Sequence, residues 1–250
     1  MMTSVGFLGC GKIGKEMVRH LRAQADHSVA FVQSPNFVDD FDLGCPVVRQ
    51  LDESICQADL VVECATADVL KQHSEFYLRN SDMLVFSVTA FSDEAFAQRA
   101  QSLCQAHGTH LYIPHGAILG LDGICDARPL LKSVTIDTIK SPASLGRSDR
   151  ERQVVYEGPT RGACVEYPRN VNVHAAVAIA GMGFDDTKSR IISDPAVTTN
   201  SHAICIEGDG ISFRLEISST ASGGITGRYT PVSACGSLDR VLGGGEFRFV

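Results

Sequence analysis

Short apolar runs and amphipathic stretches alternate through the first part of the chain, up to Pro114. The apolar runs, each typical of a buried strand, are Val5–Leu8, Val29–Gln33, Asp59–Glu63, Met83–Val88 and His110–Ile113. Helical periodicity follows three of these runs, at Lys12–Gln24, Val69–Leu78 and Ser92–Cys104, with Ser92 as the expected N-cap of the last. Strands that alternate with helices predict a doubly wound, parallel α/β sheet.

The pattern changes after Pro114, where apolar and polar residues begin to alternate with the period of half-buried strands. Segments of this kind are Ser133–Lys140, Gln153–Glu157, Ser189–Ser193, Ala203–Glu207 and Ser212–Ser218. Helices are expected at Asn172–Ala180 and at Thr230–Leu242. The second half therefore predicts an α+β domain built on a mostly antiparallel sheet.

The change of pattern also predicts the domain organisation. Residues 1–114 form the doubly wound domain, and a C-terminal helix within 228–250 returns to complete it. Residues 115–227 form the α+β domain, which is inserted between these two parts. The glycine-punctuated segment His115–Gly123 is where the chain is expected to leave the first domain.

The glycines of the first βα turn are the clearest chemical signal. Gly9, Gly11 and Gly14 have the spacing G-x-G-x-x-G, and Lys12 and Ile13 stand between the last two, where the helix begins. In a Rossmann domain the first glycine makes the tight turn, the second lets the pyrophosphate approach, and the third lets helix and strand pack closely. The alternative is that these glycines only serve a tight turn. We expect a dinucleotide site.

The end of the second predicted strand bears on the choice of cofactor. A carboxylate at this point of a Rossmann domain usually binds the adenosine ribose. Here the chain has Gln33 and Ser34, with neither a carboxylate to repel a 2′-phosphate nor an arginine to attract one. The sequence therefore leaves NAD and NADP both open.

Ligands of open α/β sheets gather at the carboxyl ends of the strands. Ala65, Thr66 and Ser87 follow two of the predicted strands and are candidates to line the nicotinamide side of the cofactor site. The alternative is that they are only the turn residues of these strand ends.

Composition and charge narrow the class of protein. The net charge of −7 does not favour a nucleic acid or an anionic membrane as partner, and no apolar run approaches the roughly 18 residues of a membrane span. Strand pattern begins at the N-terminus, so no signal peptide is expected. The nine scattered cysteines have no C-x-x-C pair or Cys/His cluster. They predict reduced thiols, a cytoplasmic protein and no metal site.

Three segments of the second half resemble a known family. They are His115–Ala117, Tyr167–Val173 and Asp194–His202. With the glycine fingerprint and the V-V-E run that ends at Glu63, their order resembles that of the L-aspartate dehydrogenases over nearly the full length. The shared pattern is a G-A-I segment, P-K/R-N-x-N-V, and D-P-x-V followed by N-x-H.

The resemblance implies roles for the matched positions. Ala117 and Asn172 would contact the nicotinamide cofactor, and His202 would be the catalytic histidine. The implied reaction is the NAD(P)-dependent oxidation of L-aspartate to iminosuccinate, or its reverse from oxaloacetate and ammonia. Iminosuccinate hydrolyses to oxaloacetate or feeds quinolinate synthesis. Two positions depart from the family: His115 replaces a small residue, most often serine, and His174 replaces a residue that is more commonly alanine.

Chemical reasoning on the residues agrees with this role of His202. Hydride transfer from a carbon that bears an amine requires the neutral amine, and histidine is suited to hold the released proton. The Asp194–Pro195 turn would hold the loop that aims His202, while the alternative is that His202 only caps the following strand.

The substrate residues are less sharply indicated. Two carboxylates require cations or N–H donors, and His115, Thr198 and Thr199 are the substrate candidates near the implied catalytic residues. Arg161, Arg169 and Lys140 are further possible partners for the carboxylates.

Two other functions remain open from the sequence. One keeps the fold and the hydride chemistry but acts on a different amino or oxo acid, accommodated by His115. The other is a non-catalytic NAD(P)-binding sensor. The open sheet of the second domain also favours a homodimer, because one of its faces needs cover.

Overall fold

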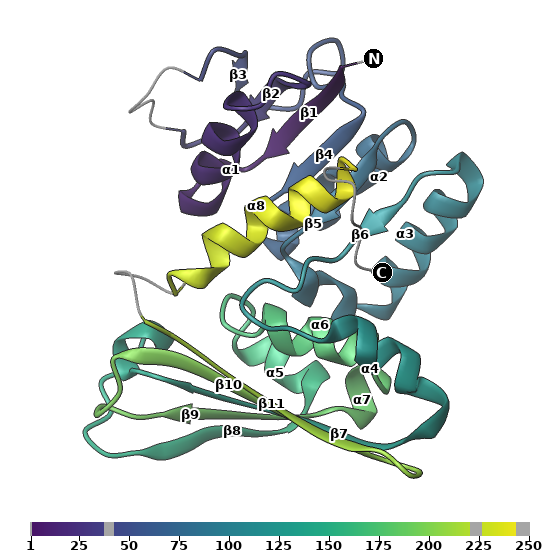
Figure 1. Cartoon of the computed structure of the whole chain (residues 1–250). Coiled ribbons are helices and arrows are strands. Elements are labelled where there is room, and N and C mark those ends of the chain that lie inside the picture. Colours follow the sequence, from purple (N-terminus) through teal and green to yellow (C-terminus); the bar gives the residue numbers. More distant parts are fainter. Residues whose placement is uncertain (1, 38–42, 221–226, 244–250) are drawn as a thin grey trace. The chain divides into compact units, whose positions relative to one another are not determined.

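The computed structural model describes residues 2–37, 43–220 and 227–243. The chain divides into two compact units, which we call unit 1 and unit 2. Unit 1 runs to Pro114 and takes up the chain again from Ala234, and unit 2 runs from His115 to Ser233. Figure 1 shows the elements of each unit.

Unit 1 is built on a six-stranded sheet of order β3-β2-β1-β4-β5-β6. Its strands are β1 (Thr3–Leu8), β2 (His27–Gln33), β3 (Val47–Val48), β4 (Leu60–Glu63), β5 (Asp82–Val85) and β6 (Leu111–Tyr112). All neighbouring strands are parallel. The doubly wound sheet predicted from the sequence is confirmed.

The helices of unit 1 are α1 (Lys12–Arg22), α2 (Ala67–Leu78) and α3 (Glu94–His107). Helix α8 (Tyr229–Val241) begins in unit 2 and continues into unit 1, where Ala234 and Leu238 are fully buried beside β1 in the core. A last helix is thus present where the sequence predicted one. The part of the expected 228–250 segment beyond residue 243 lies outside the described residues.

The structure corrects the sequence analysis around the end of β5. The strand ends at Val85 instead of Val88, and a 3-10 turn, η1 (Val88–Ser92), follows it. The N-cap of α3 is Asp93 and not Ser92, because the Asp93 carboxylate accepts a hydrogen bond of 3.1 Å from the Phe96 amide. The Ser92 hydroxyl instead donates to the Thr89 carbonyl at 2.8 Å.

Unit 2 contains a five-stranded sheet of order β11-β10-β7-β9-β8. Its strands are β7 (Leu131–Lys140), β8 (Gln153–Pro159), β9 (Lys188–Ser193), β10 (Thr199–Gly208) and β11 (Ser212–Thr220). Only the β7–β9 pair is parallel, so the predicted, mostly antiparallel sheet is confirmed. Strand β10 begins four residues earlier than predicted, which places His202 inside it rather than ahead of it.

Helices gather on one face of this second sheet (Figure 1). They are α4 (Leu121–Ala127), α5 (Thr160–Glu166), α6 (Asn172–Ala180) and α7 (Gly183–Asp186), and short 3-10 turns η2 (Arg128–Leu130) and η3 (Pro142–Leu145) flank β7. Inward-facing Val134 and Ile136 of β7 and Ile204 and Ile206 of β10 pack with Val177 of α6 in the core. Helix α6 has the bounds that the sequence predicted, whereas α4 and α5 were not expected.

The corrected cap of α3 can be tested by substitution. Asp93→Ala removes an N-cap that also receives Lys71 Nζ at 2.9 Å, and should lower the free energy of unfolding by about 1 kcal/mol in urea titrations. Ser92→Ala is the matched control and should cost clearly less. Equal losses from both substitutions would contradict the assignment.

Candidate functional site

The three glycines of the first βα turn occupy different environments. Gly9 has a φ of +89°, and a Cβ there would lie 2.7 Å from the Cβ of Ala65. A Cβ on Gly14 would lie 2.9 Å from Cys64 Sγ and 3.1 Å from the Gly9 carbonyl oxygen. A Cβ on Gly11 would meet nothing within 4 Å. Gly9 and Gly14 are therefore required by the fold, whereas Gly11 leaves open space at the surface of the turn.

The N-terminus of α1 opens onto this space. Gly11 is the N-cap and has no side chain to cap the helix, and no acidic residue lies in the first turn. The first amides of a helix, together with its dipole, attract an anion. Lys12 is exposed at the same end. This open cradle and its donors fit the pyrophosphate of a dinucleotide.

The end of β2 holds the turn in place from one side. The Gln33 carbonyl accepts from the Gly9 amide at 2.8 Å, and the Gln33 side chain is buried and accepts from the Tyr77 hydroxyl. Ser34, which follows it, is half-buried. Gln33 thus anchors the strand end, and Ser34 presents the more accessible side chain of the pair.

Glu63, the last residue of β4, was named in the sequence only as the end of the V-V-E run, and the structure gives it a central position at this edge of the sheet. Its fully buried carboxylate accepts from the Ala65 amide at 2.8 Å and from the Ser87 amide and hydroxyl at 2.9 and 2.7 Å. Burial raises the pKa of Glu63 to about 7, while the hydrogen bonds oppose that rise. One carboxylate therefore ties together the loops that follow β4 and β5.

The candidates Ala65, Thr66 and Ser87 lie at the carboxyl ends of β4 and β5, as expected. Each also has a structural role. Ala65 and Ser87 bind Glu63, and the Thr66 hydroxyl caps α2 through the Val69 amide at 3.4 Å. These contacts fix the edge of the sheet at which ligands of this fold bind.

A group of buried polar side chains lies on the inward face of β7 and β10 in unit 2. His202 is the cross-strand partner of Thr138, so both side chains point to the helix-covered face. Lys140 lies two residues beyond Thr138 on the same face. Thr138, Lys140 and His202 are at most 5% exposed. The apolar core of the sheet thus gives way to a buried polar cluster at one end.

A continuous series of hydrogen bonds begins at His202 and runs through the interior of unit 2. It passes in order through His202, Thr138, His174, Ser189, Thr160 and the carbonyl of Thr187. The successive distances are 2.8, 2.6, 2.9, 2.7 and 3.0 Å, starting from His202 Nδ1. We call this series the buried chain. All its members are buried, so His174 is a structural part of this cluster.

Burial determines the charge of this cluster. Desolvation, followed by the positive charge of Lys140, lowers the pKa of His202 to about 3. Desolvation, followed by the charges of His202 and Lys140, lowers the pKa of His174 well below its usual value. Desolvation also lowers the pKa of Lys140 to about 8. At neutral pH the two histidines are therefore uncharged.

The other predicted cofactor contacts lie in neighbouring parts of unit 2. Asn172 is the first residue of α6, two positions before His174. Ala117 lies in a turn in which Gly116 has a φ of +60° and the Ile118 amide binds the His115 carbonyl at 3.0 Å. The half-buried His115 ring stacks on Tyr229 with a centroid distance of 6.4 Å.

The predicted substrate residues differ in their placement. Thr198 is exposed on the bend before β10. Thr199 begins that strand three residues before His202, and strand alternation therefore turns the two side chains to opposite faces. The Asp194 carboxylate holds the preceding turn through the Ala196 amide at 2.9 Å.

The cationic candidates separate in the same way. Arg161 forms a surface ion pair with Asp185 at 2.6 Å, and Arg169 is exposed. Lys140 is buried and bonds the Asn170 side-chain oxygen at 3.2 Å. Of the three, only Lys140 belongs to the polar cluster.

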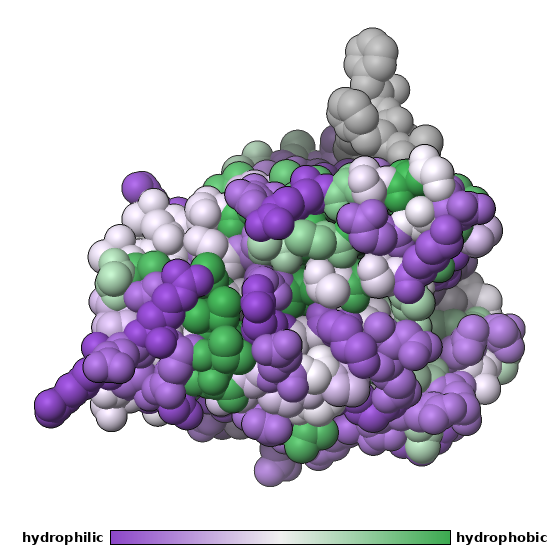
Figure 2. Space-filling view, turned by 90° about the horizontal axis from the view of Figure 1, so that it is seen from below, coloured by the Kyte–Doolittle hydropathy of each residue, from purple (hydrophilic) through white to green (hydrophobic). Residues whose placement is uncertain are grey.

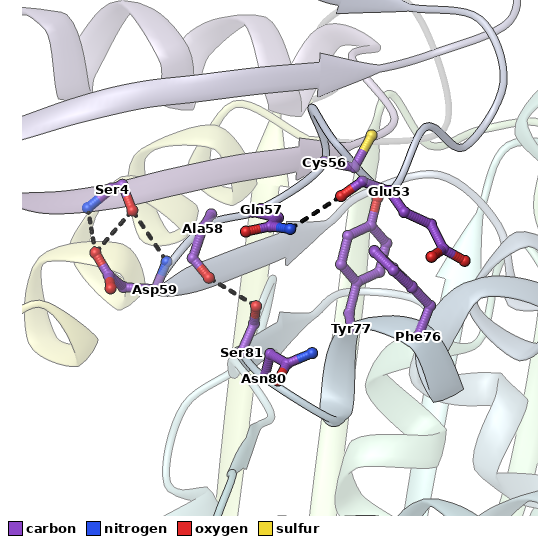
Figure 3. A pocket seen from close by; sticks show the side chains of 10 residues that line it. All are labelled: Ser4, Glu53, Cys56, Gln57, Ala58, Asp59, Phe76, Tyr77, Asn80 and Ser81. Atoms are coloured by element: carbon purple, nitrogen blue, oxygen red, sulfur yellow. Dashed lines mark hydrogen bonds between the residues drawn. The ribbon is translucent and has the colours of Figure 1, made fainter.

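A cavity of about 540 Å³ lies elsewhere in unit 1 (Figure 3). It is at the amino ends of β1 and β4, the sheet edge opposite the glycine turn. Its polar groups bond one another: the Ser4 hydroxyl binds Asp59 at 2.7 Å, and the Ser81 hydroxyl binds the Ala58 carbonyl at 2.6 Å. We assign it no part in cofactor binding.

The cysteines and the helices add two further observations. All nine cysteines are free thiols. Within the described ranges, no group of three or more His, Cys, Asp or Glu side chains is arranged to hold a metal ion. In the same part of the chain, no helix is long and apolar enough to cross a membrane.

Comparisons with known proteins match both units of the chain. Residues 9–114 match the family model "Homoserine dehydrogenase, NAD binding domain", and residues 124–241 match "Aspartate dehydrogenase, C-terminal". An L-aspartate dehydrogenase of Methanococcoides burtonii is 32% identical over 96% of this chain and 97% of its own. One from Serratia proteamaculans is 35% identical over 78% of this chain and 79% of its own.

A solved structure extends the likeness to the whole fold. The crystal structure of aspartate dehydrogenase from Thermotoga maritima has a TM-score of 0.81 and 27% sequence identity, and the match covers 100% of both chains. The glycine turn on a parallel sheet and these matches together identify the chain as an NAD(P)-dependent oxidoreductase. Within that class, the chain belongs to the L-aspartate dehydrogenase family.

The glycine turn yields a paired test. Gly11→Ala should leave the free energy of unfolding within about 0.5 kcal/mol, because its Cβ meets open space, but should weaken NADH binding about tenfold or more by filling the phosphate cradle. Gly14→Ala should instead destabilise the fold through the contact with Cys64. Titration of NADH fluorescence and urea unfolding separate the two effects, and unchanged NADH affinity in Gly11→Ala would contradict the cradle.

The depressed pKa of His202 predicts a loss of stability in acid. Its folded pKa of about 3 lies below the unfolded value of 6.5, so protonation favours the unfolded chain. The contribution of the uncharged His202 to the free energy of unfolding is fully present above pH 6.5, and about a few kcal/mol of it is lost toward pH 3. His202→Gln should flatten this slope in urea titrations between pH 7 and 4.5, where Glu63 and the surface carboxylates act alike in both proteins. Equal slopes in the wild type and in His202→Gln would show that His202 is not the source of the acid sensitivity.

Proposed function

We propose that this protein interconverts L-aspartate and iminosuccinate with NAD(P), and that His202 and Lys140 form the polar centre of the reaction. The observation that carries the proposal is the burial of an uncharged histidine beside a buried lysine, in a chain of the L-aspartate dehydrogenase family. A buried cation and a buried base suit a substrate that brings two carboxylates and an amine.

His202 serves as the proton acceptor. The amine of L-aspartate must lose a proton before its lone pair can form the C=N bond as hydride leaves the α-carbon. The carboxylates of the substrate offset the positive charge of Lys140 and raise the pKa of His202 toward the range in which it can take that proton. Hydrolysis of iminosuccinate then gives oxaloacetate and ammonia.

Lys140 pairs with one substrate carboxylate. Lys140 as a whole is 4% exposed and its pKa is lowered to about 8 by burial, so an anionic partner would be strongly favoured there. Thr198 and His115 are proposed as further substrate contacts at the edge of the centre, and Thr199 is proposed to contribute through its backbone, because its side chain points to the other face.

The cofactor, when bound, accepts or supplies the hydride. Gly9, Gly11 and Gly14, with Lys12 and Ile13 at the start of α1, are proposed to hold its pyrophosphate. Ser34, next to Gln33, is proposed at the adenosine ribose, and Ala65, Thr66 and Ser87 at the strand ends on the nicotinamide side. Ala117 and Asn172 are proposed to contact the nicotinamide. Nine free thiols support a reducing, cytoplasmic setting.

The open face of the second sheet supports the proposal of a homodimer. Strands β7 and β10 present half-buried Thr135, Ile139, Ala203 and Cys205 on the face opposite His202. Figure 2 shows the side from below, where hydrophobic and hydrophilic side chains are interspersed. A second copy of the chain would cover this face.

The activity assay follows NAD(P)H oxidation with oxaloacetate and ammonia. His202→Ala should lower kcat by about 100-fold or more and retain NADH binding. Lys140→Met should mainly raise the KM for oxaloacetate, by about tenfold or more, through the lost ion pair. Lys132→Met, an exposed lysine on the same strand, is the matched control.

Two outcomes would contradict the proposal. A wild-type protein that binds NADH tightly but does not turn over would exclude the aspartate reaction, and a panel of other amino and oxo acids would then identify the substrate. Full activity in His202→Ala would exclude its role as the proton acceptor.

A further inference from the structure

The direction of every hydrogen bond in the buried chain follows from its far end. The Thr187 carbonyl can only accept, so the single hydroxyl proton of Thr160 is donated to it. Thr160 then has only lone pairs left for Ser189, and the Ser189 hydroxyl must donate to Thr160. Ser189 in turn can only accept from its other neighbour, so His174 donates through Nδ1–H.

The directions of the bonds in the buried chain can be followed through His174 because this histidine is uncharged. It is fully buried, its Nδ1 bonds a hydroxyl, and Lys140 and His202 are the charged or titratable groups that act on it. A neutral imidazole with Nδ1–H has a bare Nε2, which accepts the hydroxyl proton of Thr138. Thr138 then has only a lone pair for His202, so His202 donates through its own Nδ1–H.

We propose that the buried chain, ending on the Thr187 carbonyl, fixes His202 in the Nδ1–H tautomer and so leaves Nε2 as the bare, basic nitrogen. Thr138, His174, Ser189 and Thr160 are positioning residues in this arrangement. The functional consequence rests on the proposed role of His202 in the aspartate reaction, whereas the tautomer itself does not.

The buried chain orients His202 as a base and does not conduct protons. When Nε2 of His202 takes a proton, Nδ1–H stays bonded to Thr138, and no other bond in the chain has to reverse. The far end is a backbone carbonyl, which cannot take up or release a proton under ordinary conditions. The hydroxyls must therefore be present, but no net proton passes through them.

Nitrogen NMR tests the tautomer directly on the full-length protein. The protein is labelled with ¹⁵N-histidine and measured near pH 7.5, where protonated and bare ring nitrogens of a neutral imidazole give well-separated signals. The His202 and His174 signals are assigned with His202→Gln and His174→Gln. We expect Nδ1–H and bare Nε2 at both residues. Nε2–H at His202 in the wild type would overturn the proposal, whatever the substrate.

Substitutions test whether the chain sets this tautomer. Thr138→Val keeps the shape of the side chain but removes the hydroxyl, and should give mixed tautomers at His202 and lower kcat about 10- to 100-fold with little change in KM. Thr138→Ser should restore both readouts. Ser189→Ala, which is not in direct contact with His202, should shift the tautomer in the same direction and more weakly.

Thr135→Val is the matched control. It makes the same chemical change on the same strand, on the opposite face of the sheet. It should leave the tautomer and kcat unchanged. A Thr138→Val protein with wild-type tautomer and kcat would overturn the proposal. If the valine variant unfolds, Ser189→Ala keeps the test decisive, and a wild-type tautomer in that variant would likewise overturn it. A wild-type protein that shows the Nδ1–H signal at His202 but does not turn over aspartate would reject the proposed function and leave the tautomer standing.

Discussion

The antiparallel pairing of β7 with β10 is the constraint on which the chemistry of unit 2 depends. It sets His202 opposite Thr138 on the helix-covered face, with Lys140 two residues away on that face. A register shift of one residue would turn the side chains of one strand to the open face. The apolar pairs Val134–Ile206 and Ile136–Ile204 pin the register, because they must face the core in the same alignment. Packing at one end of the sheet therefore positions the buried polar cluster at the other.

In unit 1, a single buried carboxylate has a comparable effect. Glu63 cannot be left without partners in the interior, so the loops after β4 and β5 must bring their donors to it. Those are the loops from which a Rossmann sheet approaches its cofactor. Together with the crowded positions of Gly9 and Gly14, this requirement constrains the backbone of the edge, while the space beside Gly11 stays open. Steric crowding and polar satisfaction thus shape the edge before any ligand binds.

The sequence predicted most of the strands and the long helices, because their periodicity is local. Helix α6 has its predicted bounds, and the glycine turn has the expected order of strand, turn and helix. Helices α4 and α5 were missed because seven residues give too little periodicity to recognise. Ser92 and Asp93 are adjacent residues of good capping type, and only the geometry of the preceding turn decides between them. The resemblance supplied His202, and Lys140 was one of three cationic candidates. The hydrogen bonds of Glu63, the place of Lys140 in the polar cluster and the buried chain depend on contacts between distant segments, which no local pattern encodes.

Strand β10 is divided along its length, with Ile204 and Ile206 in the apolar core and Asn200 and His202 in the polar end. The two ends share a backbone but make separate side-chain contacts. Mutations that repack the apolar end but keep its inward-facing pairs, and with them the register, can therefore accumulate while the polar end keeps its geometry. Conversely, residues of the polar end can change toward other substrates while the apolar end of the same strand keeps the protein stable. An architecture of this kind lets robustness and specificity evolve on different residues of one element.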